Sequence, residues 1–170
     1  MNDSLKIVGL MSGTSMDGLD CCISEISINS RSLFNYNIIA EKSFYFNHSL
    51  KNRIKKAIGE TRKNKINEIN QFLGLKFLDL SKDFLSQHSF DYISMHGQTI
   101  YHHDRLESIQ VADPSYFASF FNVPVIYNFR QKDIELGGTG APLMPFLDWL
   151  LFKDKKKNVR IIITRHNRKN

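Results

Sequence analysis

Three consecutive segments with β-strand patterns precede the first helical pattern, and this order limits the fold more than any other feature of the chain. Residues 6–10 form a short apolar run, and residues 19–28 and 37–46 combine partial alternation with β-branched side chains. We therefore expect a sheet that opens with three strands connected by turns.

Helical and strand patterns alternate along the rest of the chain. Helical spacing of apolar residues begins at Ser49 and recurs over residues 66–85, 114–121 and 142–152. Short strand patterns cover residues 91–95, 124–127 and 159–163, and residues 129–141 are expected to form a glycine-containing loop. Gly74 weakens the case for one unbroken helix in the second helical segment. This order predicts an α/β domain with a mixed sheet.

The net charge of +6 comes from the last residues of the chain. Residues 153–170 contain eight Lys or Arg against one acid, which leaves 15 basic and 16 acidic residues in residues 1–152. A domain with a net charge of −1 is not expected to bind a phosphate backbone, so the basic pI does not indicate a nucleic-acid partner. We expect two parts, a domain over residues 1–152 and a basic tail over residues 153–170.

The chain shows no sign of membrane insertion or export. No run approaches the ~18 uninterrupted apolar residues of a membrane span, and the polar residues at positions 2–4 are unlike a signal peptide. The two cysteines, Cys21 and Cys22, are adjacent, cannot cross-link distant segments and are typical of a reducing compartment. We expect a cytoplasmic protein without a membrane partner.

The segment GLMSGTSMDGLD, residues 9–20, has the composition of a loop that approaches a ligand closely. Its glycines permit tight turns, its hydroxyls donate hydrogen bonds, and successive backbone N–H groups can form an anion-binding nest. Asp17 and Asp20 are suited to hold Mg²⁺, directly or through water, against phosphate oxygens. The segment matches neither a Walker A loop nor a dinucleotide fingerprint. A hairpin turn rich in Ser, Asp and Gly explains the pattern equally well.

The sequence HGQT at residues 96–99 is expected just past the carboxyl end of a strand, where open α/β sheets place ligand contacts. His96 is suited to hydrogen-bond a substrate hydroxyl, and the competing interpretation is a core histidine whose hydrogen bonds are satisfied. His102 and His103 do not complete a zinc site, because adjacent strand residues point to opposite faces and no Cys or Glu adds to them.

The segment FRQKDIELGGTGAP, residues 129–142, combines Arg130, Lys132 and Asp133 with three glycines. Such a loop suits a site that handles a sugar hydroxyl and a phosphate, and Asp133 is suited to take a proton from an attacking nucleophile. A charged surface loop with glycine turns is the competing explanation. The spacing indicates no Ser-His-Asp or Cys-His arrangement.

Taken in this order, the three segments resemble the anhydro-N-acetylmuramic acid kinase family. The resemblance covers residues 7–152, although residues 29–85 contribute little motif information. It implies a lobe of the actin-like, sugar-kinase and Hsp70 (ribonuclease H-like) ATPase fold with a mixed sheet, the first of two lobes. The chain would then stop before the second lobe, with residues 159–163 as that lobe's first strand.

The resemblance also implies a reaction in peptidoglycan recycling. ATP, water and 1,6-anhydro-N-acetylmuramic acid would give ADP and N-acetylmuramic acid 6-phosphate, with Mg²⁺ required. Water would open the 1,6-anhydro bond while the freed O6 receives the γ-phosphoryl group. The implied partners are a second copy in a homodimer and a separately encoded second lobe. Because half of the ATP clamp would be absent, we expect the chain alone to be inactive.

The family's motifs assign roles to individual residues of this sequence. Asp133, in the Phe-Arg-x-x-Asp motif, is the implied base that activates the water, and Asp17 is the implied water-mediated contact to Mg²⁺. The implied first phosphate loop consists of Gly13, Thr14, Ser15, Met16, Asp17, Gly18, Leu19 and Asp20. The implied sugar contacts are His96, Gln98, Arg130 and Gly138.

The chain departs from the family pattern at three motif positions. Ala112 replaces a Gly, Asn128 replaces an Asp and Thr139 replaces a Gln. The backbone at Ala112 is expected to be more restricted than a glycine, and Thr139 is expected to alter contacts to the sugar. The alternative function is a non-catalytic lobe that binds sugar or a partner protein.

Overall fold

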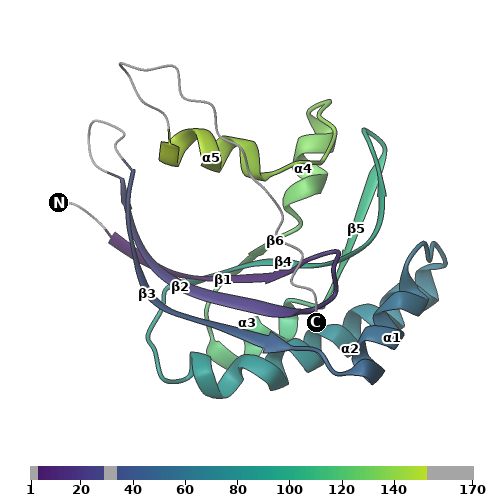
Figure 1. The fold of residues 1–170 in the computed structure, drawn as a ribbon, viewed down its shortest axis with the longest axis horizontal. Coiled ribbons are helices and arrows are strands. Elements are labelled where there is room, and N and C mark those ends of the chain that lie inside the picture. The colour runs from purple at the N-terminus through teal and green to yellow at the C-terminus, as the bar shows by residue number, and fades with distance from the viewer. Residues whose placement is uncertain (1–3, 29–33, 153–170) are drawn as a thin grey trace, which may run out of the picture.

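The computed structural model describes residues 4–28 and 34–152 and contains a mixed sheet with helices on both faces (Figure 1). In chain order the elements are β1 (Ser4–Ser12), β2 (Gly18–Ile28), β3 (Phe34–Tyr45), α1 (His48–Ala57), α2 (Lys63–Leu85), β4 (Tyr92–His103), β5 (Glu107–Val111), α3 (Ser115–Phe121), β6 (Val125–Tyr127), α4 (Phe129–Glu135) and α5 (Met144–Phe152). Within this part of the chain, no helix is both long and apolar enough to span a membrane. The expected three-strand opening and α/β class are confirmed, whereas the basic tail and the expected strand at residues 159–163 lie outside the described residues.

The sheet is mixed because its central strands run in both directions. The strand order is β3-β2-β1-β4-β5, and the short β6 also pairs with β4. β1 is antiparallel to β2 and parallel to β4, and β4 is parallel to β6 and antiparallel to β5. Since parallel neighbours need a crossover connection, the chain returns from β3 to β4 through α1 and α2. This crossover places the carboxyl end of β1 beside the HGQT segment of β4.

The hydrophobic core lies between the sheet and the layer formed by α1, α2 and α3 (Figure 1). Val8 and Leu10 point into it from β1, because alternate side chains of a strand face the same side. Ile54, Leu73 and Phe77 meet them from the helices and are fully buried. The opposite face of the sheet carries α4 and α5, and none of the residues in these two helices is fully buried. This face, where no helix residue is fully buried, therefore lies next to the HGQT segment and contains the start of the segment at residues 129–142.

Two expectations about the second half of the chain are wrong. The HGQT segment lies inside β4, which continues to His103 because it pairs there with β5, a strand that the sequence pattern does not predict. Phe129–Glu135 forms α4 instead of a loop. These seven residues contain no Gly or Pro, and the glycines of the segment begin only at Gly137.

Helix α2 continues unbroken through Gly74 because the glycine permits a close backbone contact. A Cβ at Gly74 would lie 2.6 Å from both the backbone N and O of Asp113 and 2.9 Å from Cδ2 of Tyr116. The Asp113 N–H donates to the Asn70 carbonyl, one helical turn earlier, at 2.9 Å. The segment before α3 thus packs directly on the backbone of α2.

The substitution Gly74→Ala is expected to lower the free energy of unfolding by about 1–3 kcal/mol, because the new methyl group must displace backbone atoms. The opposing gain in helix propensity is roughly 1 kcal/mol. Urea unfolding followed by circular dichroism measures the difference. The control is Gln71→Ala, an exposed position on the same helix, where the change is expected to stay within about 0.5 kcal/mol. A Gly74→Ala chain as stable as the native one would contradict the packing role.

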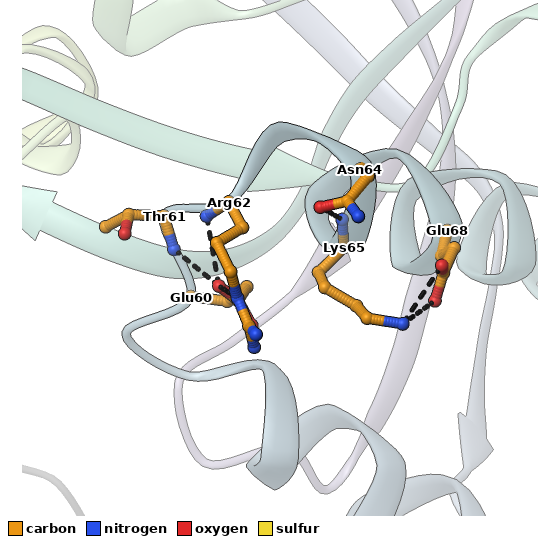
Figure 2. A network of polar contacts seen from close by, with 6 residues as sticks. All are labelled: Glu60, Thr61, Arg62, Asn64, Lys65 and Glu68. Carbon is orange, nitrogen blue, oxygen red and sulfur yellow. Dashed lines mark hydrogen bonds and ion pairs between the residues drawn. The ribbon is translucent and has the colours of Figure 1, made fainter.

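The connection between α1 and α2 is ordered by polar contacts at the surface (Figure 2). Glu60 accepts hydrogen bonds from the backbone N–H groups of Thr61 and Arg62 at 3.1 and 3.0 Å, and the Arg62 guanidinium donates to both carboxylate oxygens. The Arg62 side chain, followed by these backbone donors, lowers the pKa of Glu60 to about 2. One turn into α2, Lys65 and Glu68 form an ion pair at 2.8 Å. Glu60 therefore stays charged to a lower pH than an ordinary glutamate and holds the residues that lead into α2.

Candidate functional site

The turn between β1 and β2 is the exposed part of the candidate phosphate loop. Only residues 13–17 lie outside the two strands. Met16 has a left-handed backbone conformation with φ 55°, and its N–H donates to the Gly13 carbonyl at 3.0 Å, which closes the turn. Thr14 and Ser15 are exposed at its tip. The structure therefore presents two hydroxyls and a compact stretch of backbone to solvent.

The remaining candidates of this loop belong to β2 and have different surroundings. Gly18 packs against the Phe44 carbonyl of β3, and Leu19 is buried in the core. Asp20 is exposed and accepts a hydrogen bond from the Ser43 hydroxyl of β3. Asp20 is thus open to a ligand, whereas Leu19 supports the loop from within the core.

Gln98 fixes the base of the turn from inside the protein. Its side chain is 0 % exposed, and its Oε1 accepts from the Ser12 hydroxyl at 2.7 Å. Its Nε2 donates to the carbonyls of Gly13 and Thr99, both at 3.2 Å. Protein groups therefore occupy this amide, which supports the turn from inside the protein, and a contact of Gln98 with a sugar stays a prediction.

The substitution Gln98→Leu is expected to lower the free energy of unfolding by about 2–4 kcal/mol, because the buried Ser12 hydroxyl and the Gly13 carbonyl lose a partner. Urea unfolding measures the loss. Gln110→Leu, on the adjacent strand β5, is the control. Gln110 Oε1 is buried without a hydrogen-bond partner among the described residues, and its Nε2 donates only to the hydroxyls of Ser108 and Thr99, at 2.7 and 3.3 Å, so the substitution leaves no backbone carbonyl without its donor. We expect a smaller loss for the control, and equal losses would contradict the role of Gln98.

Asp133 lies on α4, and its carboxylate is held by the glycine loop that follows. Its Oδ2 accepts from the Gly140 N–H at 2.7 Å, and its backbone carbonyl accepts from the Gly138 N–H at 2.8 Å. A Cβ at Gly138 would collide with the Asp133 carboxylate. The side chain is exposed, and because the Gly140 hydrogen bond uses Oδ2, Oδ1 can accept a hydrogen bond or a proton from water.

His96 and Arg130 join the central strand β4 to α4 and its loop. Arg130 Nε donates to His96 Nε2 at 3.1 Å, and Arg130 Nη1 donates to the Gly140 carbonyl at 2.8 Å. His96 Nδ1 lies 2.9 Å from the Gly97 carbonyl. A guanidinium only donates and a carbonyl only accepts, so the imidazole is neutral with its proton on Nδ1. Burial above all lowers the pKa of His96, the Arg130 charge adds to this effect, and the Gly97 carbonyl opposes it.

Comparison with known protein families shows to which family the chain belongs. The family model of anhydro-N-acetylmuramic acid kinase matches residues 5–164. The chain belongs to this kinase family. The resemblance inferred from the three motifs is therefore confirmed.

Two curated relatives illustrate how far the similarity extends. An anhydro-N-acetylmuramic acid kinase of Clostridioides difficile (strain 630) is 36 % identical over 167 residues, which cover 91 % of this chain and 43 % of the relative. A kinase of the same name from Bacillus cereus (strain Q1) is 34 % identical over 170 residues, covering 91 % of this chain and 44 % of the relative. The chain thus spans less than half the length of these relatives.

Strand β4 contacts both of the other segments that relate the chain to the kinase family. Gln98 bonds to the turn at residues 13–17, and His96 bonds to Arg130 on α4. The structure therefore joins the three motifs through one strand. The family resemblance implies that Gln98, His96 and Arg130 contact the sugar. In the structure, all three side chains also form hydrogen bonds with other parts of the protein.

Two clefts meet at His96. One, of about 670 Å³, lies between the sheet and the start of α5 and is lined in part by Asp20, Ser43 and Phe129. The other, of about 600 Å³, lies beside β5, α2 and α3, and its lining includes the amides of Asn67, Asn70, Gln110 and Gln131. Amides donate and accept hydrogen bonds in fixed directions, so the second cleft has the side chains that suit sugar hydroxyls.

The described residues offer Mg²⁺ a single carboxylate contact at the turn, and no group of three or more His, Cys, Asp or Glu among them could hold a metal. Asp17 is exposed, with Oδ1 3.7 Å from Nζ of Lys51 on α1. Magnesium at phosphoryl-transfer sites keeps several waters and binds one or two carboxylates together with substrate phosphates. Asp17 therefore fits the implied water-mediated contact.

Sequence reasoning missed the roles of two residues of this region, Lys51 and Gly140. Lys51 places a cation beside the turn, and its helical segment carries no motif that would reveal this. Gly140 bonds to both Arg130 and Asp133, which the Gly-Gly-x-Gly spacing could have suggested. Ala112, at the position where the family has a Gly, adopts φ 121°, a conformation that favours glycine. The expected restriction at Ala112 is thus present as a strained backbone.

Proposed function

We propose that the chain supplies the catalytic base and the first phosphate loop of an ATP-dependent anhydro-N-acetylmuramic acid kinase. The observation that carries the proposal is the double contact of β4, through Gln98 with the turn and through His96 with the helix that bears Asp133. The family match over residues 5–164 supports it. In this proposal, residues 1–152 form the first lobe of an actin-like ATPase fold and residues 153–170 lead into the second lobe.

The proposed reaction couples hydrolysis to phosphoryl transfer. Water attacks the anomeric carbon and gives its proton to Asp133, while the bond between C1 and O6 breaks. The freed O6 attacks the γ-phosphorus of ATP, the bond from that phosphorus to the bridging oxygen breaks, and ADP leaves. The products are ADP and N-acetylmuramic acid 6-phosphate. Mg²⁺ bound with ATP would neutralise the negative charge of the phosphates.

The chain's own residues bind and orient the reactants in this proposal. The turn at residues 13–17 offers backbone N–H groups and the hydroxyls of Thr14 and Ser15 to phosphate oxygens. Asp17 contacts the metal through water. The amide-lined cleft beside β5 receives the sugar, with His96 at its boundary to the cleft between the sheet and the start of α5. The location is the cytoplasm, where the family's salvage of murein fragments would take place.

A coupled ADP-release assay with Mg·ATP and 1,6-anhydro-N-acetylmuramic acid tests the proposal. Because the chain spans only 43 % of the C. difficile relative, it is assayed alone and mixed with the part of that relative beyond the alignment. We expect sugar-dependent ADP release in the mixture and none from the chain alone, since closure around ATP needs both parts. ADP release that ignores the sugar, or no release in either preparation, would contradict the proposal.

A non-catalytic lobe that docks to another polypeptide is the second candidate function. Helix α5 favours it, because Phe146 and Phe152 are 71 % and 53 % exposed and such apolar patches are typical of protein contacts. The partner would be a second copy of the chain or a polypeptide that corresponds to the rest of the relatives. Light scattering of the chain and of the mixture, run beside the assay, distinguishes docking with turnover from docking without it.

A further inference from the structure

We propose that His96 and Arg130 form a latch that positions Asp133, and that protonation of the His96 imidazole opens this latch. The latch consists of the His96 side chain on β4, the Arg130 side chain on α4 and the backbone of Gly140 in the following loop. The inference rests on the proposed function only for the role of Asp133 as the base. His96 and Arg130 are positioning residues in it, not sugar contacts.

A β-bulge between His96 and Gln98 places these two side chains on opposite faces of the sheet, because it reverses the alternation of buried residues along β4. The register between β1 and β4 changes from Leu10 opposite Met95 to Met11 opposite Gly97, which leaves His96 as the extra residue of β4. Residues two apart in a regular strand face the same side of a sheet. Here Gln98 bonds to the buried turn base, whereas His96 bonds to α4 on the other face. A bulge that re-aims a side chain in this way is a recurrent feature next to active sites.

Arg130 connects two acceptors on different segments. Its Nε donates to His96 Nε2 at 3.1 Å, and its Nη1 donates to the carbonyl of Gly140 at 2.8 Å. Gly140 is buried, and its N–H donates to Asp133 Oδ2 at 2.7 Å. The carbonyl and the N–H of one residue are thus held by Arg130 and Asp133. The Asp133 carboxylate is tied to the rigid sheet through this continuous set of hydrogen bonds.

The latch needs a neutral imidazole. Arg130 can bond to His96 Nε2 only while that nitrogen carries a lone pair, and a proton there would place a second cation against the guanidinium. Burial, followed by the Arg130 charge, lowers the pKa of His96, while the Gly97 carbonyl raises it. The folded chain therefore keeps the latch closed at neutral pH and loses it as the pH falls through the lowered pKa.

Other titratable groups line the clefts beside His96. They are Asp20, Cys21, Cys22, Glu41 and Lys42 on the side of β2 and β3, and Glu107, Asp113 and Tyr127 on the side of β5. Of these groups and the charged side chains of α4, Arg130 is the one that bonds directly to the His96 imidazole. Its removal is therefore the change expected to raise the pKa of His96.

Nuclear magnetic resonance of the 170-residue chain, without ATP or sugar, tests the latch. Nitrogen shifts of the His96 ring report which nitrogen carries the proton and at which pH it titrates. Amide hydrogen exchange of Gly140, relative to its intrinsic rate at each pH, reports the loop. We expect the proton on Nδ1, a pKa of His96 below its usual value, and loss of Gly140 protection as His96 titrates. A proton on Nε2 in the native chain would overturn the inference.

Three variants separate a latch from a general effect on the fold. Arg130→Gln is expected to raise the pKa of His96 and to speed Gly140 exchange about tenfold, as for loss of one hydrogen bond. Lys132→Gln, an exposed charge on the same helix, is the control and is expected to change neither. His96→Gln keeps an acceptor that does not titrate, so it is expected to retain Gly140 protection in acid. Unchanged Gly140 exchange in Arg130→Gln, or acid opening of His96→Gln like that of the native chain, would overturn the inference.

These measurements involve no nucleotide or sugar, so they are independent of the proposed kinase activity. A negative ADP-release assay with a closed, titrating latch would remove the proposed function and leave the latch. Sugar-dependent turnover by a chain in which Gly140 exchange does not change as His96 titrates would remove the latch and leave the proposed function.

Discussion

An Asp133→Asn chain is expected to lose sugar-dependent ADP release by a factor of about 10²–10⁴ while keeping its fold. Asparagine retains an oxygen that can accept the Gly140 N–H, the hydrogen bond that holds the loop at 2.7 Å in the native chain. Its amide lacks the basicity to take a proton from water. The loss is therefore expected in kcat rather than in the KM for the sugar, and the coupled assay of the active preparation measures both.

The matched control for this substitution is Glu135→Gln on the same helix. Glu135 is exposed, lies 3.8 Å from Lys132 and carries the same charge as Asp133, but it does not hold the glycine loop. Its replacement is expected to leave ADP release unchanged. An equal loss in both variants would indicate that the charge of α4 matters rather than a base at one position. Full turnover by Asp133→Asn would remove Asp133 from the mechanism.

The sequence predicts the parts of the fold that local patterns specify. The opening strands alternate buried and open positions, as Val8 and Leu10 show, and α2 follows its apolar spacing. The length of β4 could not be predicted, because His96 to Thr99 reads as a polar turn until its pairing with β1 and β5 is known. Helix α4 was not predicted because the glycines that follow Phe129–Glu135 indicate a loop, although these seven residues themselves form a helix.

The candidate site shows a similar limit. The motifs locate the correct segments, but the partners of Gln98 and Arg130 are set by contacts between residues 86 and 34 positions apart. Local spacing carries no information about such pairs. A β-bulge at His96 is also invisible without the register, although Gly97, at φ 75°, marks the irregular backbone. The sequence therefore predicts the chemistry of the side chains better than their orientation.

The substitution Gly138→Ala is expected to reduce turnover about 100-fold, because a displacement of the base by roughly 1 Å is sufficient for such a loss. A Cβ at this position would collide with the Asp133 carboxylate, which is the end of a flexible side chain and can rotate away. The rotation breaks its hydrogen bond to Gly140, so the free energy of unfolding is expected to fall by only about 1 kcal/mol. The coupled assay and urea unfolding of the same preparation measure the two effects.

Gly137→Ala provides a control with the opposite expected pattern. A Cβ at Gly137 would meet nothing within 4 Å, but the residue has φ 88°, so alanine there is expected to lower the free energy of unfolding by about 1–2 kcal/mol. Because the Asp133 carboxylate is untouched, turnover is expected to be retained. If the Gly137→Ala chain lost as much activity as the Gly138→Ala chain, the loop as a whole, rather than the position of Asp133, would control the reaction.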